Sequence, residues 1–195
     1  ELGGARIHAK SGLVDNVAED EHAALAECRR FLSYLPSSVY ERTPRYETDD
    51  SPERMEEELL KMVPRDSNQG FDMRSIIEMV VDLGSFFFFF RDYGASQIVG
   101  LARLSGQPVG VLANDCMVYA GAMTAEAAQK YRRFVEMCDM FHVPVINFID
   151  QPGFMIGPEA ERKGTIRYGM AAVAAAAQAT IPWASIQVHL SLIHI

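Results

Sequence analysis

The segment from Val143 to Gly157 contains the residues whose order suggests chemistry. An apolar run of strand-forming residues ends in Asp150, and Gln151-Pro152-Gly153-Phe154 follows at once. A strand, a Gly/Pro turn and a helix in that order are typical of ligand sites in α/β folds, because the turn leaves backbone N–H groups free beside a helix N-terminus. The turn contains no Ser, Cys or His nucleophile. We therefore expect oxyanion stabilisation by the backbone N–H groups of Gly153 and Phe154.

Each candidate residue also has a structural interpretation. Gly153 would supply an unusual φ to an ordinary turn, and Asp150 would either orient the loop or cap the turn. Gly157, Gly164 and Gly169 suit the close approach of a ligand and tight helix packing equally well.

Two further residues are candidates for the pocket wall. Arg167 would pair with a carboxylate or phosphate, or lie on a solvated helix face. Gly121 lies in Tyr-Ala-Gly-Ala and would line the pocket. The five histidines show no ligand spacing, so we expect no metal site.

The composition excludes several classes of protein. The chain has 195 residues and a formal charge of −8, which argues against a general binder of nucleic acid or anionic membranes. No apolar run reaches the roughly 18 to 20 residues of a membrane span. Cys28, Cys116 and Cys138 are not closely spaced. We expect them to be reduced, buried thiols in a cytoplasmic protein.

Hydrophobic periodicity predicts the elements that position the turn. We expect residues 1–18 to be strand ends and loop, 36–52 to be a linker, and three helices to cover 19–35, 51–62 and 72–82. A hairpin (98–104 and 108–113), a helix begun by Thr124 and ending near Phe141, a strand (143–149), a helix (164–180) and a strand (183–188) follow. This order repeats a ββα unit rather than a strict β-α alternation. Five consecutive Phe, 86–90, indicate either a fully buried strand or a sequencing error.

Together these passages resemble the carboxyltransferase subunits of biotin-dependent acyl-CoA carboxylases, of the beta type that serves propionyl-CoA and acetyl-CoA carboxylases. The resemblance covers nearly all of residues 3–188. It rests on Gly12-Leu-Val-Asp15 with the helix that ends at Pro36, Phe71-Asp-Met-Arg74 with Ile76–Asp82, Ile98–Gly110, Ala128–Lys130, Arg133-Phe134, Cys138-Asp139, Asp150-Gln-Pro-Gly-Phe154 through Gly157, and Gly164-Thr-Ile-Arg167 with Gly169.

The resemblance implies an α/β, crotonase-like ββα superhelix, with the end of one domain copy followed by most of a second. It implies carboxyl transfer from carboxybiotin, carried by a biotin carboxylase or biotin carrier subunit, to the α-carbon of a short acyl-CoA, without a metal in this subunit. It places Asp150, Pro152, Gly157, Gly164, Arg167 and Gly121 around the biotin side of the site. It also implies a homo-oligomer with active sites between domains of different subunits.

The same resemblance divides the chain into four parts. Residues 1–36 would end the N-terminal carboxyltransferase domain, 37–70 would form a linker with a short helix, and 71–189 would form an incomplete C-terminal domain. The sequence of residues 190–195 matches the translation of a transposase-type sequencing adapter, so we expect these residues to be a non-native tail. The family's Gly-rich loops before Glu1 and after Val188 are absent, and residues 88–90 replace an acid, an aliphatic and a small residue. We therefore expect the fragment to be inactive alone.

Two other functions remain open from the sequence. One is another crotonase-type acyl-CoA enzyme, such as a decarboxylase on the same scaffold. The other is a non-catalytic assembly module that oligomerises through the helix at 124–141.

Overall fold

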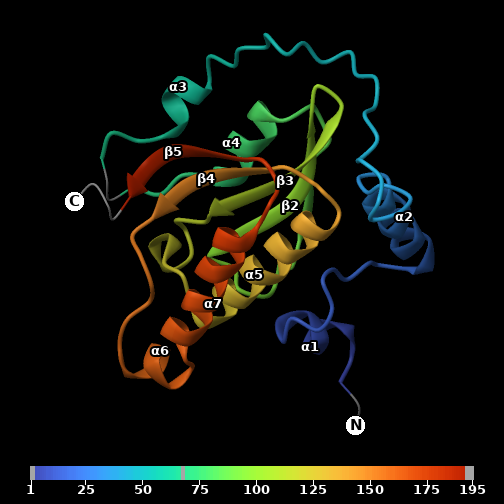
Figure 1. Cartoon of the computed structure of the whole chain (residues 1–195). Helices are drawn as coiled ribbons and strands as arrows, with labels where there is room; N and C mark the ends of the chain where they lie inside the picture. The colour runs from blue at the N-terminus through green and yellow to red at the C-terminus, as the bar shows by residue number, and fades with distance from the viewer. Residues whose placement is uncertain (1–2, 67–68, 192–195) are drawn as a thin grey trace.

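A computed structural model describes residues 3–66 and 69–191 and contains one five-stranded sheet in the order β1-β2-β3-β4-β5 (Figure 1). The strands are β1 (Phe87–Phe89), β2 (Gln97–Leu104), β3 (Gln107–Asn114), β4 (Val145–Gln151) and β5 (Trp183–Ser191). Strands β1, β2 and β3 pair antiparallel, and β3, β4 and β5 pair parallel. The parallel half therefore brings the carboxyl ends of β3, β4 and β5 to one edge, where α/β folds bind ligands.

Helices cover both faces of the sheet (Figure 1). Helices α5 (Ala125–Met140) and α7 (Thr165–Gln178) lie on one face, and α4 (Met73–Val80) lies on the other. The remaining helical segments are α1 (Ala5–Lys10), α2 (Glu21–Leu32), α3 (Leu59–Met62), α6 (Pro158–Arg162) and the short 3-10 turn η1 (Tyr119–Gly121).

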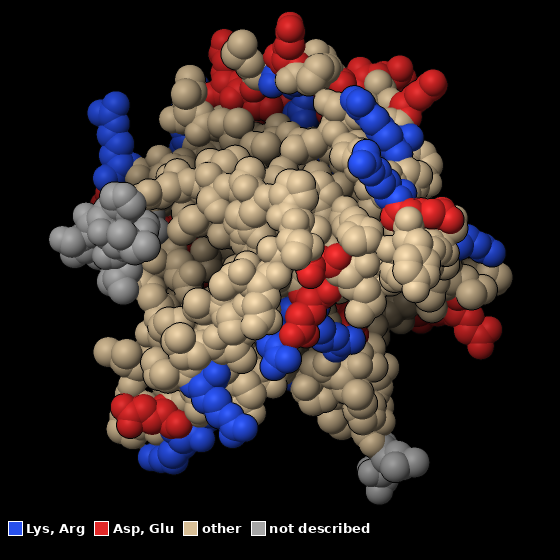
Figure 2. Space-filling model, in the orientation of Figure 1, with Lys and Arg blue, Asp and Glu red and all other residues tan. Residues whose placement is uncertain are grey.

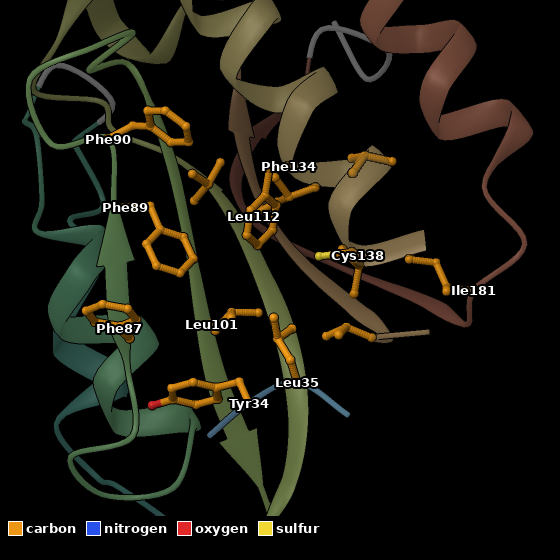
Figure 3. Close-up of a cluster of buried hydrophobic side chains, with 14 residues drawn as sticks. Tyr34, Leu35, Phe87, Phe89, Phe90, Leu101, Leu112, Phe134, Cys138 and Ile181 are labelled. Carbon is orange, nitrogen blue, oxygen red and sulfur yellow. The ribbon is translucent and has the colours of Figure 1, made fainter. Parts of the chain in front are cut away.

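The alternation of side chains along each strand builds two cores. Phe87 and Phe89 of β1 pack with Phe134 of α5, Leu101 and Leu112 (Figure 3). The intervening residues of the strands face the other side and pack on α4. This second cluster contains strand residues together with residues in and beside α4: Phe71, Met73, Ile76, Ile77, Val81, Phe88, Ile98, Ala102, Val109, Val111, Ala113, Ile146 and Phe148. Both faces are buried, which is why these strands read as nearly continuous apolar runs.

The structure confirms most of the predicted elements. The hairpin, the helix begun by Thr124, the helix in 164–180 and the last strand are all present, and the Thr124 hydroxyl accepts the Ala127 N–H at 3.1 Å. The helix predicted over 72–82 is α4, capped by Asp72. Strand β4 begins and ends two residues later than predicted, because its ladder to β5 continues to Gln151. Residues 87–89 form a fully buried strand, one of the two interpretations of the Phe run.

Two predicted segments are wrong. Residues 5–10 form a helix rather than strand ends and loop, since Ala, Arg and Lys favour helix there. Of the helix predicted over 51–62, only Leu59–Met62 is helical. Arg54 binds Asp50 at 2.8 Å, Glu56 at 2.6 Å and the Val81 carbonyl at 2.7 Å. The bond to Val81 is the long-range contact of the three, and together they hold residues 51–58 outside a helix.

The burial expected for the cysteines is wrong for Cys28 and only partly met by Cys116. Cys28 is exposed, Cys116 is half-buried and Cys138 is buried, and all three are free thiols. Helix α2 has the predicted position but buries none of its residues, since it contacts the core mainly through Phe31 and the residues just after its end.

Most charged side chains lie on the surface, and Lys130, Asp115 and Asp150 are the buried ones among the described residues. Figure 2 shows acidic side chains gathered over the segment that joins α2 to α3. Within the described residues, no helix is long and apolar enough to cross a membrane. The backbone of residues 190 and 191 continues β5, whereas residues 192–195 of the predicted tail lie outside the described residues.

Lys130 is a buried cation in the middle of α5. It is 1% exposed, and its Nζ donates to the carbonyls of Phe90 at 2.8 Å and Gly94 at 3.4 Å. Burial lowers the pKa of Lys130 to about 7, with a further lowering by Arg74. A neutral amine still carries N–H donors, so Lys130 holds the loop between β1 and β2 in either protonation state.

Three cations surround the ring of Phe88. Arg74, Arg91 and Lys130 lie 4.7, 5.7 and 5.5 Å from the ring centroid. These contacts place three cations within cation–π distance of one buried ring.

We expect the stability of the chain to rise with pH between pH 7 and pH 9. In this interval the unfolded Lys130, with its ordinary pKa of 10.5, binds a proton that the folded side chain has released. The slope approaches about 1 kcal/mol per pH unit in denaturant unfolding. Above pH 9 the buried Cys138 opposes it, because burial raises the pKa of that thiol and only the unfolded thiol ionises.

The Lys130→Met variant is the control. It fills the same space without a titrating group, so its unfolding free energy should be flat over this interval. A slope that survives in Lys130→Met, or a wild-type chain without one, would contradict the assignment.

Candidate functional site at the end of strand β4

The turn after β4 is fixed to the segment that precedes α5. Met123 donates its N–H to the Gly153 carbonyl and accepts the Met155 N–H, each at 2.9 Å. The two segments thus form one isolated parallel bridge between Met123 and Phe154. The bridge holds the backbone of the turn in place without any side chain.

This arrangement leaves two backbone donors available. In the part of the chain that the structure describes, neither the Gly153 N–H nor the Phe154 N–H donates to a protein acceptor. The peptide that joins them is trans, so the Phe154 N–H points opposite to the Gly153 carbonyl and away from Met123. Gly153 has a φ of 138°, a conformation that favours glycine. A pair of preorganised N–H donors is what an oxyanion hole requires.

Asp150 is buried beneath the turn. It is 3% exposed, its N–H donates to the Asn114 side chain at 3.2 Å, and its carboxylate lies 3.3 Å from Nδ1 of His189. The carboxylate continues the face of β4 that carries Ile146 and Phe148. Asp150 therefore fixes the end of β4 against β3 and β5.

Gly121 lies directly against Asp150. A Cβ on Gly121 would be 2.5 Å from the Asp150 carbonyl oxygen, and its φ is 76°. The sequence predicts that Gly121 lines the pocket. The contact that the structure gives it is with the backbone of Asp150, which is a packing contact.

The chain before Gly121 is strained. Tyr119 and Ala120 both have a φ of 50°, so three successive residues adopt left-handed conformations. Each such non-glycine residue costs about 1–2 kcal/mol. Such conformations persist only where surrounding contacts hold the backbone in place. Here the three residues lead directly into the segment that forms the Met123 bridge.

The Phe154 side chain packs on α7 at Gly169. A Cβ on Gly169 would overlap the Phe154 ring. Of the two interpretations of Gly169, the structure supports close packing. Beside the ring lies a cavity of about 190 Å³ whose lining includes Gln97, Asn114, Asn147 and Gln151.

A second cavity, of about 540 Å³, opens at the exit of the turn. Met155 and Ile156 line one side, the first residues of α5 line another, and Ser96 and Lys10 close it. Glu126 on its rim pairs with Lys163 at 3.0 Å. Burial alone would raise the pKa of Glu126, but hydrogen bonds from its own N–H and from Lys163 lower it. The turn therefore separates two hollows, and the larger one has room for a ligand ring.

The other predicted residues flank this site. Pro152 is half-buried within the turn. Gly157 precedes α6 with a φ of 111°, and no atom lies within 4 Å of the position that an added Cβ would take. Gly164 precedes α7 with a φ of 75°, and Arg167 is exposed on α7. Within the described ranges, no three His, Cys, Asp or Glu side chains converge on a metal-sized space.

Sequence reasoning missed two residues of this region. Lys130 falls on the buried face of α5 between Ala127 and Phe134, and that periodicity was a signal. Ser96, 2% exposed, lies in a loop and carries no sequence signal.

Comparison with known proteins places the chain in a family. The carboxyl transferase domain model matches residues 1–191, and the chain belongs to that family. It is 40% identical over 183 residues to the carboxyltransferase subunit of propionyl-CoA carboxylase from Haloferax mediterranei, covering 93% of this chain and 36% of that protein. It is 38% identical over 183 residues to methylmalonyl-CoA decarboxylase subunit alpha from Veillonella parvula, with the same two coverages.

A solved structure confirms the fold. Transcarboxylase 12S, described as a hexamer with methylmalonyl-coenzyme A bound, superimposes with a TM-score of 0.91 at 34% identity, covering 95% of this chain and 36% of that one. The predicted crotonase-like α/β fold is therefore correct. The chain spans about a third of the length of these relatives.

The Gly121→Ala variant tests the contact with Asp150. We expect it to lose about 2–4 kcal/mol of unfolding free energy in urea, because the new Cβ meets a fixed carbonyl oxygen. Gly84→Ala is the matched control, since Gly84 has a φ of 68° and open space around it. It should lose only about 1 kcal/mol. Equal losses would show that the positive φ alone, and not the Asp150 contact, makes glycine necessary at position 121.

A double-mutant cycle tests the packing of the Phe154 ring on Gly169. An alanine within a helix is about 1 kcal/mol more favourable than glycine, yet Gly169→Ala should destabilise the chain because its Cβ displaces the ring. In the Phe154→Ala background the same change should stabilise. The coupling free energy should be about 2 kcal/mol in denaturant unfolding. Additive effects would mean that the ring does not rest on Gly169.

Proposed function

We propose that this chain forms part of a carboxyltransferase that moves a carboxyl group from carboxybiotin to the α-carbon of propionyl-CoA or acetyl-CoA. The main support is the pair of backbone N–H groups at Gly153 and Phe154. The Met123 bridge fixes the turn that contains them, and neither N–H has an acceptor in the described chain. Membership of the carboxyl transferase family supports the reaction class.

The residues present fit a biotin ring system. Carboxybiotin would supply the activated carboxyl group. The N–H groups of Gly153 and Phe154 would donate to the oxygen that gains negative charge as that group leaves, namely the ureido oxygen. Asp150 and Gly121 would act by fixing the turn. Pro152, Gly157, Gly164 and Arg167 remain proposed neighbours of the same ligand.

The proposed enzyme needs partners. A biotin carboxylase or biotin carrier subunit would deliver the cofactor. Assembly with further copies of the subunit is supported by apolar side chains on α7, where Ile166, Met170 and Val173 are 58%, 57% and 50% exposed at helical spacing. We propose that the isolated chain is inactive, because such sites need a second set of donors for the thioester enolate.

A second candidate is decarboxylation of an acyl-CoA on the same scaffold. The similarity to methylmalonyl-CoA decarboxylase subunit alpha favours it. The turn would act in the same way, and the fate of the carboxyl group separates the two functions. A transferase returns it to an acyl-CoA, whereas a decarboxylase releases it.

A chimera tests the proposal. Residues 3–188 would replace the aligned segment of the Haloferax mediterranei subunit, and exchange of labelled carboxyl between methylmalonyl-CoA and free biotin would be measured. We expect exchange, and we expect Gly153→Ala to reduce it about 100-fold, because a side chain disfavours the φ of 138° and misplaces the donors.

Gly4→Ala is the control for that variant. Gly4 has a negative φ, and no atom lies within 4 Å of the position that an added Cβ would take, so the rate should not change. A Gly153→Ala chimera with full exchange would contradict the role of the turn. Net release of the label without exchange would favour the decarboxylase.

A further inference from the structure

A cavity of about 340 Å³ lies between α2, β1 and α5. None of the residues that line it lines either hollow beside the turn, and the function proposed above does not use it. Its volume is within the range of cavities that hold small organic ligands. The chemistry of its wall therefore indicates which ligand it would take.

Most of the wall is aromatic. Phe89 of β1 packs edge-on against Phe31 of α2, with ring centroids 5.7 Å apart, and lies 6.3 Å from Phe134 of α5. Figure 3 shows Phe87 and Phe89 projecting from β1 on the side of Phe134. Such a wall favours a ligand with an apolar body, because binding removes apolar surface from water. The faces of Phe rings also attract cations.

Glu27 is a charged residue of the wall without an opposite charge. It is half-buried, and its Oε2 accepts the Asn16 side-chain N–H at 3.0 Å. Its second oxygen, Oε1, has no hydrogen-bond partner in the described chain and is accessible to solvent. No ion pair among residues 3–66 and 69–191 includes Glu27. A carboxylate in this position can accept a further charged donor.

The other two charged residues of the wall are paired with each other. Arg133 binds Asp15 at 3.2 Å and also donates to the Gly12 carbonyl at 3.3 Å. Burial raises the pKa of Asp15, and Arg133 offsets this only in part. The wall thus carries two carboxylates and one guanidinium, and the guanidinium is directed at Asp15. The excess of negative charge favours a cation and disfavours an anion.

Helix α2 places the carboxylate beside the aromatic wall. Glu27 and Phe31 are four residues apart, so they lie on one face of the helix. Asn16 donates both to Glu27 and, at 3.2 Å, to the Phe88 carbonyl, so it holds the carboxylate close to β1. A ligand can therefore contact the apolar wall and Glu27 at the same time.

We infer that this cavity binds an apolar ligand that carries one ammonium group, with its apolar body between Phe31, Phe89 and Phe134 and its ammonium at the carboxylate of Glu27. The inference goes beyond the proposed function and does not depend on it.

Three probes that share a phenyl ring on a two-carbon chain test the class of ligand. 2-Phenylethylamine, 2-phenylethanol and 3-phenylpropionate would be titrated into the 195-residue chain by calorimetry. We expect the amine to bind about tenfold more tightly than the alcohol, since it adds a charge-assisted hydrogen bond, and the carboxylate to bind most weakly. Equal affinities, or tighter binding of the carboxylate, would overturn the inference, as would no binding of the amine.

Glu27→Gln tests the residue. The amide keeps an oxygen that can accept from Asn16 and removes the charge, so the amine should bind about tenfold more weakly and the alcohol as before. Glu21→Gln is the matched control, because it makes the same change of charge in the first turn of the same helix and lies outside the cavity. It should leave both affinities unchanged. An unchanged amine affinity in Glu27→Gln, or an equal loss in Glu21→Gln, would overturn the role of Glu27.

Cys28 reports where the amine binds. It is an exposed free thiol in the wall of the cavity, next to Glu27. Saturating 2-phenylethylamine should slow its alkylation by iodoacetamide, and 3-phenylpropionate at the same concentration should not. If the amine binds while Cys28 reacts at its original rate, the ligand lies elsewhere and the inference falls. The carboxyl-exchange assay on the chimera decides the proposed function separately.

Discussion

The backbone bridge between Met123 and the turn at 153–155 is the interaction on which the rest of the site depends. Two hydrogen bonds of 2.9 Å fix the carbonyl of Gly153 and the N–H of Met155. They determine which way the intervening peptides face and leave the N–H groups of Gly153 and Phe154 without a protein acceptor in the described residues. Because these contacts use only backbone atoms, the site needs correct chain geometry more than it needs particular side chains.

That geometry is supported from three sides. The left-handed residues Tyr119 and Ala120 bring Gly121 against the Asp150 carbonyl, so the strain lies next to the bridge. Phe154 rests on Gly169 of α7. The buried amine of Lys130 holds the loop before β2, which lines the larger cavity. Glycines at 121 and 169 thus determine how closely the neighbouring segments approach the turn.

Much of this fold was predictable from the sequence, because hydrophobic period and capping residues determine it locally. Thr124 begins α5, and the Asp150-Gln-Pro-Gly-Phe154 order marks the turn. The errors have tertiary causes. Arg54 of the segment 51–58 binds the distant Val81 carbonyl, and α2 contacts the core mainly through Phe31 and the residues just after its end. Ser96 could not be predicted, since an unpartnered hydroxyl is a property of three-dimensional packing alone.

The role of the turn as a donor site is tested most directly by the response of its two free backbone amides to a ligand. In ¹⁵N-labelled chain titrated with free biotin, we expect saturable downfield shifts and slowed hydrogen exchange for the amides of Gly153 and Phe154. Met155 should be unaffected, because its N–H is already bonded to Met123. If biotin perturbs other residues while both amides stay unchanged, the turn is a structural connection and not a donor site.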